Sequence, residues 1–210
     1  MDLKAHWDAV YERNSPTGVS WYQPRLSVPL RLLVSAGLQP GSRVIDIGGG
    51  ASTLVDDLLE LGVEQVTVLD VSPRALEAAK ARLGERASRV TWLVADITRE
   101  ELPAAAYDLW HDRAVFHFLT GAEDRRRYAA AMRRALKPDG QAVIATFAPQ
   151  GPPRCSGLEV VRYSPESLQA ELGGGLRLLE SLEEDHRTPA GASQAFIVCR
   201  LLAGALSAPR

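Results

Sequence analysis

The sequence predicts an α/β protein in which helices cover both faces of a doubly wound, mostly parallel sheet. Short β-branched runs alternate with segments whose apolar residues recur at helical spacing, an alternation typical of parallel sheets. The first of these runs, VIDIGGGAS at residues 44–52, ends in an acid and three glycines. The last fifth of the chain instead holds two strand-like runs, 176–183 and 194–201, with no room for a helix between them. They predict a C-terminal antiparallel hairpin at the sheet edge.

The remaining strands and helices follow from apolar periodicity and from helix start and stop signals. Ser72 and Pro73 suit a helix N-cap and first turn, and Gly84 ends the apolar pattern that follows them. Strands are expected at residues 43–47, 65–69, 90–95, 107–110 and 141–147, and helices at 6–13, 52–61, 74–84 and 124–136. The segment 148–163, which is rich in glycine and proline, is expected to be an irregular loop beside the ligand crevice.

The length and charge of the chain limit the classes of protein it can represent. It has 210 residues and a formal net charge of −2, which fits one domain with a buried core. We expect residues 1–210 to form that domain, with 1–38 as an N-terminal helical lid and 40–203 as the sheet and its helices. The near-neutral charge gives no attraction for nucleic acid or for a membrane surface.

Cysteine usage and hydropathy indicate the cellular compartment in which the protein is expected. Cys155 and Cys199 lie far apart and form no C-x-x-C pair, so no metal site is indicated and a reducing compartment is favoured. The N-terminus lacks the apolar core of a signal peptide, and no run of 18 apolar residues occurs. The sequence therefore predicts a soluble, cytoplasmic protein.

Acidic residues stand at the ends of three successive predicted strands. Asp46 lies just inside the first strand, Asp70 follows the second and Asp96 follows the third. Ligands of open α/β sheets bind at the carboxyl ends of the strands, so these acids are expected to share one crevice. Asp70 lies 22 positions after Gly48, near the spacing at which an acid binds ribose hydroxyls. A nicotinamide dehydrogenase is disfavoured because Thr53 occupies the third glycine position of the G-x-G-x-x-G fingerprint.

These motifs resemble those of the class I S-adenosylmethionine (SAM) dependent methyltransferases. VIDIGGGAS resembles their glycine motif, VLDVSPRAL their second motif, VADIT their third and LKPDGQAVIATF their fifth-strand signature. The resemblance covers nearly the whole chain and implies SAM as cofactor and a Rossmann-like, seven-stranded sheet whose last strand is antiparallel. It departs at Ser52, which replaces the last glycine of the first motif. Within that motif, Asp46 would hold water or the methionine amino group, and Gly48 and Gly50 would pass beneath the cofactor.

The second and third motifs imply how the adenosine half of SAM is bound. Asp70 would accept hydrogen bonds from both ribose hydroxyls, which makes a strong, charge-assisted pair of contacts. Val71 would pack on the adenine. Asp96 would accept a hydrogen bond from the adenine amine, and Ile97 would donate its backbone N–H.

The stretch DLWHDRAVFHFLT at residues 108–120 suggests the side of the site that faces the methyl acceptor. It resembles thiopurine and related small-molecule thiol methyltransferases, which carry an acid-Arg-Ala/Gly sequence there. His111, Asp112 and Arg113 are therefore candidate catalytic residues, with His111 the best-suited general base. Side chains alternate along a strand, so we expect one of His111 and Asp112 to line the site and the other to fix the loop.

The N-terminal segment HWDAVYERNSPTGVSWYQPRL predicts a lid over the cofactor. An amphipathic helix at residues 6–13 precedes a loop that carries Trp21 and Tyr22. Aromatic faces attract the positive sulfonium of SAM by about 0.5–2 kcal/mol. Arg25, just beyond them, is a candidate partner for the SAM carboxylate.

The sequence thus predicts a SAM-dependent methyltransferase whose acceptor is a small-molecule nucleophile, and a thiol suits the resemblance. A protein lysine methyltransferase is an alternative, although residues 112–115 read Asp-Arg-Ala-Val where that class carries acid-Lys-Gly-Thr. A non-catalytic SAM-binding module is a second alternative. Nucleic-acid methylation is disfavoured, because the chain has no N/D-P-P-Y/F motif and no basic extension.

Overall fold

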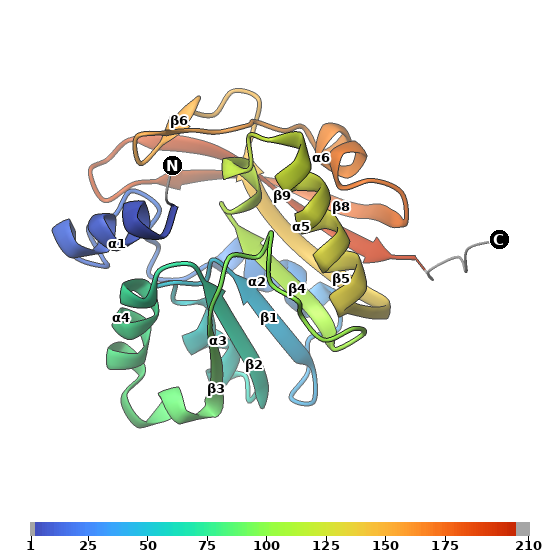
Figure 1. Ribbon diagram of the computed structural model, residues 1–210, viewed down its shortest axis with the longest axis horizontal. Helices are drawn as coiled ribbons and strands as arrows, with labels where there is room; N and C mark the ends of the chain where they lie inside the picture. Colours follow the sequence, from blue (N-terminus) through green and yellow to red (C-terminus); the bar gives the residue numbers. More distant parts are fainter. Residues whose placement is uncertain (1–2, 205–210) are drawn as a thin grey trace.

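A computed structural model of the protein describes residues 3–204, which fold around one seven-stranded sheet (Figure 1). Its strands are β1 (Arg43–Ile47), β2 (Gln65–Asp70), β3 (Val90–Val94), β4 (Tyr107–Arg113), β5 (Leu136–Phe147), β8 (Leu176–Arg187) and β9 (Ser193–Ala203). They lie in the order β3-β2-β1-β4-β5-β9-β8. β9 runs antiparallel to both of its neighbours, and the other pairs are parallel. The predicted fold class, including the C-terminal antiparallel hairpin, is confirmed.

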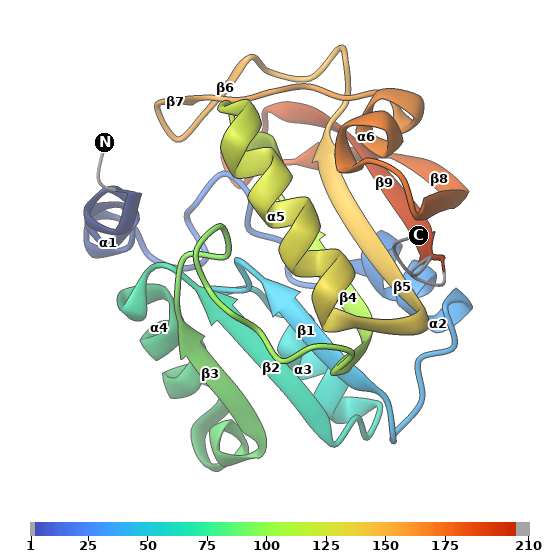
Figure 2. The ribbon, with the colours of Figure 1, turned by 45° about the vertical axis from the view of Figure 1, so that its right-hand side comes forward.

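Helices cover both faces of the sheet (Figure 2). They are α1 (Leu3–Arg13), α2 (Ser27–Ser35), α3 (Leu54–Glu60), α4 (Pro73–Leu83), α5 (Ala122–Ala135) and α6 (Pro165–Leu172), with 3-10 turns at Gly84–Arg89 and Phe116–Phe118. α5 and α6 share one hydrophobic core with the sheet, and α2, α3 and α4 share a second core on the opposite face. α1 belongs to neither layer; it packs beside α4, and none of its residues is fully buried.

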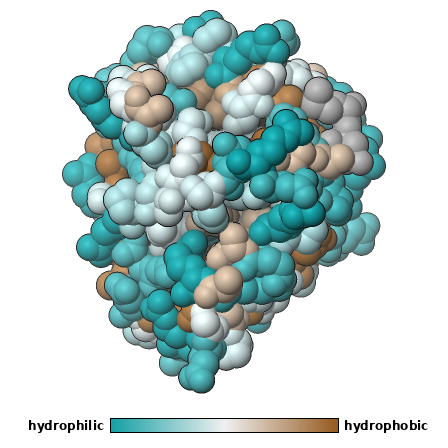
Figure 3. All heavy atoms as spheres, turned by 90° about the vertical axis from the view of Figure 1, so that its left-hand side faces the viewer, coloured by the Kyte–Doolittle hydropathy of each residue, from teal (hydrophilic) through white to brown (hydrophobic). Residues whose placement is uncertain are grey.

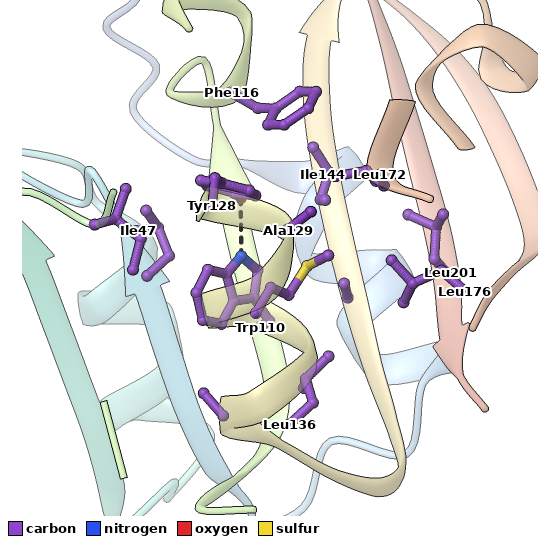
Figure 4. Close-up of a cluster of buried hydrophobic side chains, with 14 of the residues drawn as sticks. Ile47, Trp110, Phe116, Tyr128, Ala129, Leu136, Ile144, Leu172, Leu176 and Leu201 are labelled. Atoms are coloured by element: carbon purple, nitrogen blue, oxygen red, sulfur yellow. Dashed lines mark hydrogen bonds between the residues drawn. The ribbon is translucent and has the colours of Figure 1, made fainter. Parts of the chain in front are cut away.

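The core beneath α5 shows how β4 is oriented. Trp110 is fully buried, and its indole N–H donates to the hydroxyl of Tyr128 on α5, with 2.9 Å between the two atoms (Figure 4). Alternation along the strand then places Asp112 on the same face as Trp110, and His111 on the opposite face with Leu109. His111 and Asp112 therefore point to opposite faces of the sheet.

The structure differs from the sequence prediction at several elements. β4 continues through Arg113, so His111, Asp112 and Arg113 lie within the strand and not after it. The segment 148–163 contains a small two-stranded sheet, β6 (Arg154–Cys155) and β7 (Leu158–Glu159), where an irregular loop was expected. α2 and α6 were not predicted. α2 has no side-chain N-cap to signal its start, whereas Ser164 and Ser167 form a capping box before α6.

No helix within residues 3–204 is long and apolar enough to cross a membrane.

Candidate active site

Two adjoining pockets open at the carboxyl ends of the parallel strands. The larger, pocket A, holds about 880 Å³ of empty space, its open mouth included. One side of it is lined by Asp70, Val71, Asp96 and Ile97, which follow β2 and β3. The other side, called here the apolar side, is formed by Leu3, Trp7, Trp21, Phe118, Leu119 and Cys155. Pocket B is lined by Asp46, Gly49, Tyr22, Gln23 and His111, and Gly48, Tyr11, Trp21 and Arg113 line both pockets.

The glycine turn after β1 brings the backbone close to its neighbours. The N–H groups of Gly48 and Gly49 both donate to the carbonyl of Leu69, at 2.7 and 3.2 Å. Gly48 has φ +63°, and a Cβ atom there would lie 2.0 Å from Cγ2 of Val115. Gly50 has φ +37°, and its Cβ would lie 2.7 Å from Oδ2 of Asp70. The turn therefore requires glycine both for its backbone conformation and for space.

Replacing Gly48 by alanine is expected to lower the free energy of unfolding by about 2–5 kcal/mol. A positive φ costs an L-residue about 1–2 kcal/mol, and the contact with Val115 adds the strain of an overpacked site. Gly191→Ala is the matched control, because Gly191 also has positive φ but a Cβ atom there would meet nothing within 4 Å. Urea denaturation of both variants measures the difference. Equal losses would mean that the contact with Val115 contributes nothing.

Asp70 is the most strongly perturbed acid of pocket A. It is the last residue of β2, and its Oδ1 accepts a hydrogen bond from the N–H of Ser72 at 2.8 Å. Burial, assisted by the nearby carboxylates of Asp46 and Asp8, raises the pKa of Asp70 to about 7. The side chain of Tyr11 lies close by, and its pKa is raised by burial and by Asp70. A buried carboxylate of this kind favours ligand groups that donate hydrogen bonds.

Asp96 lies on the same side of pocket A in a tight turn. Its Oδ1 accepts from the backbone N–H of Thr98 at 2.9 Å and from the Thr98 hydroxyl at 2.7 Å. This turn fixes the carboxylate and presents Ile97 beside it in the pocket wall. Val71, directly after β2, lies on the same wall. The four residues predicted for the adenosine half are thus brought together.

His111 and Asp46 form a buried pair on adjacent strands. Parallel pairing of β1 with β4 sets them side by side, and Nδ1 of His111 lies 2.6 Å from Oδ1 of Asp46. Both residues are 1% exposed. Nε2 of His111 and Oδ2 of Asp46 have no hydrogen-bond partner among the described residues. The pair lines pocket B and not the apolar side of pocket A.

Asp112 does not face either pocket. Its carboxylate accepts hydrogen bonds from the backbone N–H groups of Val115 and Phe116, at 2.9 and 3.1 Å, and from the Tyr128 hydroxyl at 2.5 Å. Burial raises its pKa to about 6, against these hydrogen bonds. Asp112 therefore holds the turn after β4, and the structure separates it from His111 as the alternation of side chains requires.

Arg113 lies between the two pockets with its guanidinium buried. Nη1 donates to the carbonyl of Trp21 at 3.1 Å, and the guanidinium carbon lies 4.6 Å from the centre of the Phe196 ring. Nε and Nη2 have no partner within residues 3–204. Burial lowers the pKa of Arg113, and the negative charge of Glu184 opposes this shift.

The N-terminal segment covers both pockets. Trp7 of α1 meets Trp21 and Phe118 edge-on, with ring centres 5.6 and 5.1 Å apart. Asp8 accepts from the hydroxyl of Ser72 at 2.6 Å, which ties α1 to the start of α4. Figure 3 looks at this side of the molecule, where hydrophilic and hydrophobic residues are interspersed over the surface.

One predicted residue lies outside the site. Arg25 pairs with Asp57, with 3.1 Å between Nε and Oδ1, and lines neither pocket. Conversely, a link between Gln23 and β8 was missed at the level of sequence. Nε2 of Gln23 donates to Glu184 at 2.7 Å and lies 2.9 Å from Nδ1 of His186. These contacts span more than 160 residues, so no local pattern could indicate them.

The cysteine and acidic residues of this region are not arranged as metal ligands. Within the described part of the chain, no three His, Cys, Asp or Glu residues form a group that could hold a metal ion. Cys155 and Cys199 are both buried free thiols, and burial raises the pKa of Cys155.

Comparison with known proteins agrees with this arrangement. A family model described as a methyltransferase domain matches residues 44–140. Human EEF1A lysine methyltransferase 2 is 24% identical over 196 residues, covering 87% of this chain and 77% of the relative. The mouse eEF1A lysine and N-terminal methyltransferase is 24% identical over 68% of this chain, and the match spans 21% of its own length.

Solved structures share the fold. A structure from work on the conversion of a disulfide bond into a thioacetal group during echinomycin biosynthesis has a TM-score of 0.77 and 23% identity, covering 98% of this chain and 94% of its own. The N-methyltransferase NodS from Bradyrhizobium japonicum, in complex with S-adenosylhomocysteine (SAH), has a TM-score of 0.68 and 22% identity, with 84% of each chain covered.

The domain match and the relatives support a SAM-dependent methyltransferase, and the sheet topology is the Rossmann-like fold of the methyltransferases among its structural neighbours. The protein is an enzyme of that class, and its cofactor is SAM.

Proposed function

We propose that the protein transfers the methyl group of SAM to a small-molecule nucleophile, and that the nucleophile is a thiol. The observation that carries this proposal is the apolar side of pocket A. Its lining residues are three aromatic rings, two leucines and the Cys155 thiol. None of these groups is a general base at neutral pH, because burial raises the pKa of Cys155 above its usual value.

The cofactor would occupy pocket A as the sequence motifs imply. Asp70 would accept from the ribose hydroxyls, and Asp96 and Ile97 would bind the adenine edge while Val71 packs on its face. The adenosine would then lie along the side of pocket A formed by Asp70, Val71, Asp96 and Ile97, and the sulfonium would point toward the apolar side. The rings of Trp7, Trp21 and Phe118 suit a positive sulfonium and exclude water from the methyl group.

Methyl transfer in such a pocket depends on alignment more than on proton transfer. Holding the nucleophile in line with the methyl carbon can supply about 7–11 kcal/mol of the barrier reduction. A hydroxyl or an ammonium must also lose a proton, whereas a thiol ionises near neutral pH without help. A pocket without a base therefore favours sulfur. The structural neighbour from echinomycin biosynthesis is also connected with sulfur chemistry, through a disulfide.

Methylation of protein lysine is the second candidate, and the eEF1A lysine methyltransferases among the relatives favour it. Two features oppose it. Arg113 stands where that class carries lysine in its acid-Lys-Gly-Thr motif. No carboxylate lines the apolar side, so a lysine ammonium would meet neither a counter-charge nor a proton acceptor there.

A panel of acceptors incubated with SAM labelled on its methyl group tests the proposal. We expect transfer to small thiols and little transfer to the matched alcohols and amines. Trp7→Ala should raise the KM for the thiol and leave the affinity for SAH within about threefold, because Trp7 lies on the apolar side. Labelling of one lysate protein, with every thiol inactive, would support the lysine alternative and refute the proposal.

A further inference from the structure

Arg113 alone carries a positive charge among the described residues that line pocket A. Only one of its guanidinium nitrogens is engaged: Nη1 donates to the carbonyl of Trp21 at 3.1 Å. Nε and Nη2 are buried and have no hydrogen-bond partner within residues 3–204. Native proteins rarely leave buried N–H groups unsatisfied, and a buried cation without a bonded counter-ion is costly. The two nitrogens therefore indicate a ligand that accepts hydrogen bonds and carries negative charge.

The neighbouring acid does not take the place of that ligand. The negative charge of Glu184 acts on Arg113, but neither carboxylate oxygen hydrogen-bonds to the guanidinium. Oε1 accepts from Nε2 of Gln23 at 2.7 Å, and Oε2 has no partner in the part of the chain that the structure describes. Glu184 therefore offsets part of the charge of Arg113 and leaves its N–H groups available.

The histidines beside Arg113 do not share its charge. Burial, assisted by the charge of Arg113, lowers the pKa of His117 to about 3. The same two causes lower the pKa of His186. Both rings are therefore neutral at pH 7, and an anion that enters this region meets its positive charge at Arg113.

The guanidinium lies next to the apolar side of pocket A. Its carbon is 4.6 Å from the centre of the Phe196 ring, which covers one face of the group. Its charge also acts on the thiol of Cys155, which belongs to the apolar side together with Trp21. A group bound to Arg113 would therefore adjoin the space that we assign to the methyl acceptor.

The geometry of the two unpartnered nitrogens favours a carboxylate. Nε and Nη2 share one edge of the planar guanidinium, and their N–H groups along that edge are parallel. A carboxylate accepts from both at once and forms two charge-assisted hydrogen bonds. A phosphate carries a second negative charge, for which the described lining of pocket A offers no second cation.

We propose that the methyl acceptor is an anionic thiol, a small molecule with a carboxylate as well as its thiol, and that Arg113 selects it by binding the carboxylate through Nε and Nη2. This inference rests on the proposed function, to which it adds the charge of the acceptor. The acceptor sulfur releases its proton to water and forms a bond to the methyl carbon of SAM. The bond between that carbon and the sulfonium sulfur breaks, and SAH leaves. Arg113 takes no part in these bond changes and acts by positioning the acceptor.

Three thiols of similar size test the role of Arg113. At pH 7 the 3-mercaptopropionate ion is negative, 3-mercaptopropionamide is neutral and cysteamine is positive. Arg113→Met should lower kcat/KM for 3-mercaptopropionate about 10–100-fold, mainly through KM, and leave kcat/KM for the amide within about threefold. The value for cysteamine should not fall. Each variant is compared with the wild type on the same thiol, so differences in thiol acidity cancel.

Binding measurements supply a readout that does not depend on turnover. Calorimetric titration of 3-(methylthio)propionate, the methylated product, into the SAH complex should show about 10-fold weaker binding to Arg113→Met than to the wild type. The affinity for SAH itself should stay within about threefold. Arg200→Met is the matched control, because Arg200 pairs with Glu180 and lines neither pocket. Arg113→Lys keeps the charge without the paired edge, so its loss should be smaller, and it serves if the methionine variant does not fold.

The possible outcomes separate this inference from the proposed function. Methylation of all three thiols with no effect of charge, in the wild type and in Arg113→Met alike, would overturn the inference and leave thiol methylation standing. An equal loss on every thiol, or a large loss of SAH affinity, would also overturn it, because Arg113 would then act on the fold or on the cofactor. If no thiol is methylated, the proposed function is refuted and this inference with it.

Discussion

Asp70→Asn should strongly weaken cofactor binding and at the same time make the ligand-free protein more stable at pH 8. The carboxylate would accept two ribose hydroxyls, and hydrogen bonds to a charged group are worth about 1.5–3 kcal/mol, so SAH should bind about 10–150-fold more weakly. The stability gain follows from burial, which raises the pKa of Asp70 to about 7. The asparagine keeps the oxygen that accepts from the N–H of Ser72.

The sign of the pH effect is fixed by linkage. With a raised pKa, the folded protein binds the Asp70 proton more tightly than the unfolded chain does. The stability that the folded protein gains from the bound Asp70 proton is therefore fully present below about pH 4, and it is lost as the pH rises toward 7. At pH 8 burial of the ionised carboxylate lowers the free energy of unfolding of the wild type by about 1–4 kcal/mol, and the asparagine variant avoids this loss. Below pH 4 the free energies of unfolding of the two proteins should converge.

Thermal melts from pH 4 to pH 8 measure this difference, with Asp139→Asn at an exposed position of β5 as the control. The same linkage predicts that SAH binding to the wild type weakens below pH 7, because the ligand favours the ionised carboxylate, and that this step is absent in Asp70→Asn. An Asp70→Asn variant that is less stable than the wild type at pH 8 would refute the prediction that burial of the ionised Asp70 carboxylate destabilises the folded protein.

Asp112→Ala should lower the free energy of unfolding by about 3–5 kcal/mol. The substitution leaves two buried N–H groups, of Val115 and Phe116, and the hydroxyl of Tyr128 without their acceptor. Each such group costs about 1–3 kcal/mol when unsatisfied. For a chain of this length the midpoint of melting should fall by about 10 °C.

Asp124→Ala, on the exposed first turn of α5, is the matched control and should change stability by less than about 1 kcal/mol. Tyr128→Phe should also lower stability, since it removes one of the three hydrogen bonds to Asp112 and leaves the indole N–H of Trp110 without its acceptor. An Asp112→Ala variant that melts like the wild type but loses methyl transfer would show that Asp112 is catalytic after all.

The sequence predicted correctly those features whose signals lie within a few neighbouring residues. β-branched runs, the Ser72–Pro73 helix start and the glycine turn each carry their own signal, and they were enough to predict the sheet and the edge at which Asp46, Asp70 and Asp96 meet. The C-terminal hairpin followed because the chain between the two runs is too short for a helix.

The site could be predicted only in part, because its roles depend on partners distant in sequence. Asp46 meets His111 through the register of β1 with β4, across 65 residues. Asp112 finds Tyr128 on α5, and Arg25 is held by Asp57. Residue type and position at a strand end thus suggested which side chains mattered, but not what each one contacts.

The placement of α1 has a kinetic consequence. This helix buries no residue fully and is held at its inner face by Trp7, Tyr11 and the contact of Asp8 with Ser72, yet it forms one wall of pocket A. Because α1 contributes to the wall of pocket A, we expect that displacing this helix widens the path by which a bound nucleoside leaves. We therefore expect the residence time of SAH to shorten when the contacts that hold α1 are removed, and product release can be slower than the methyl transfer itself.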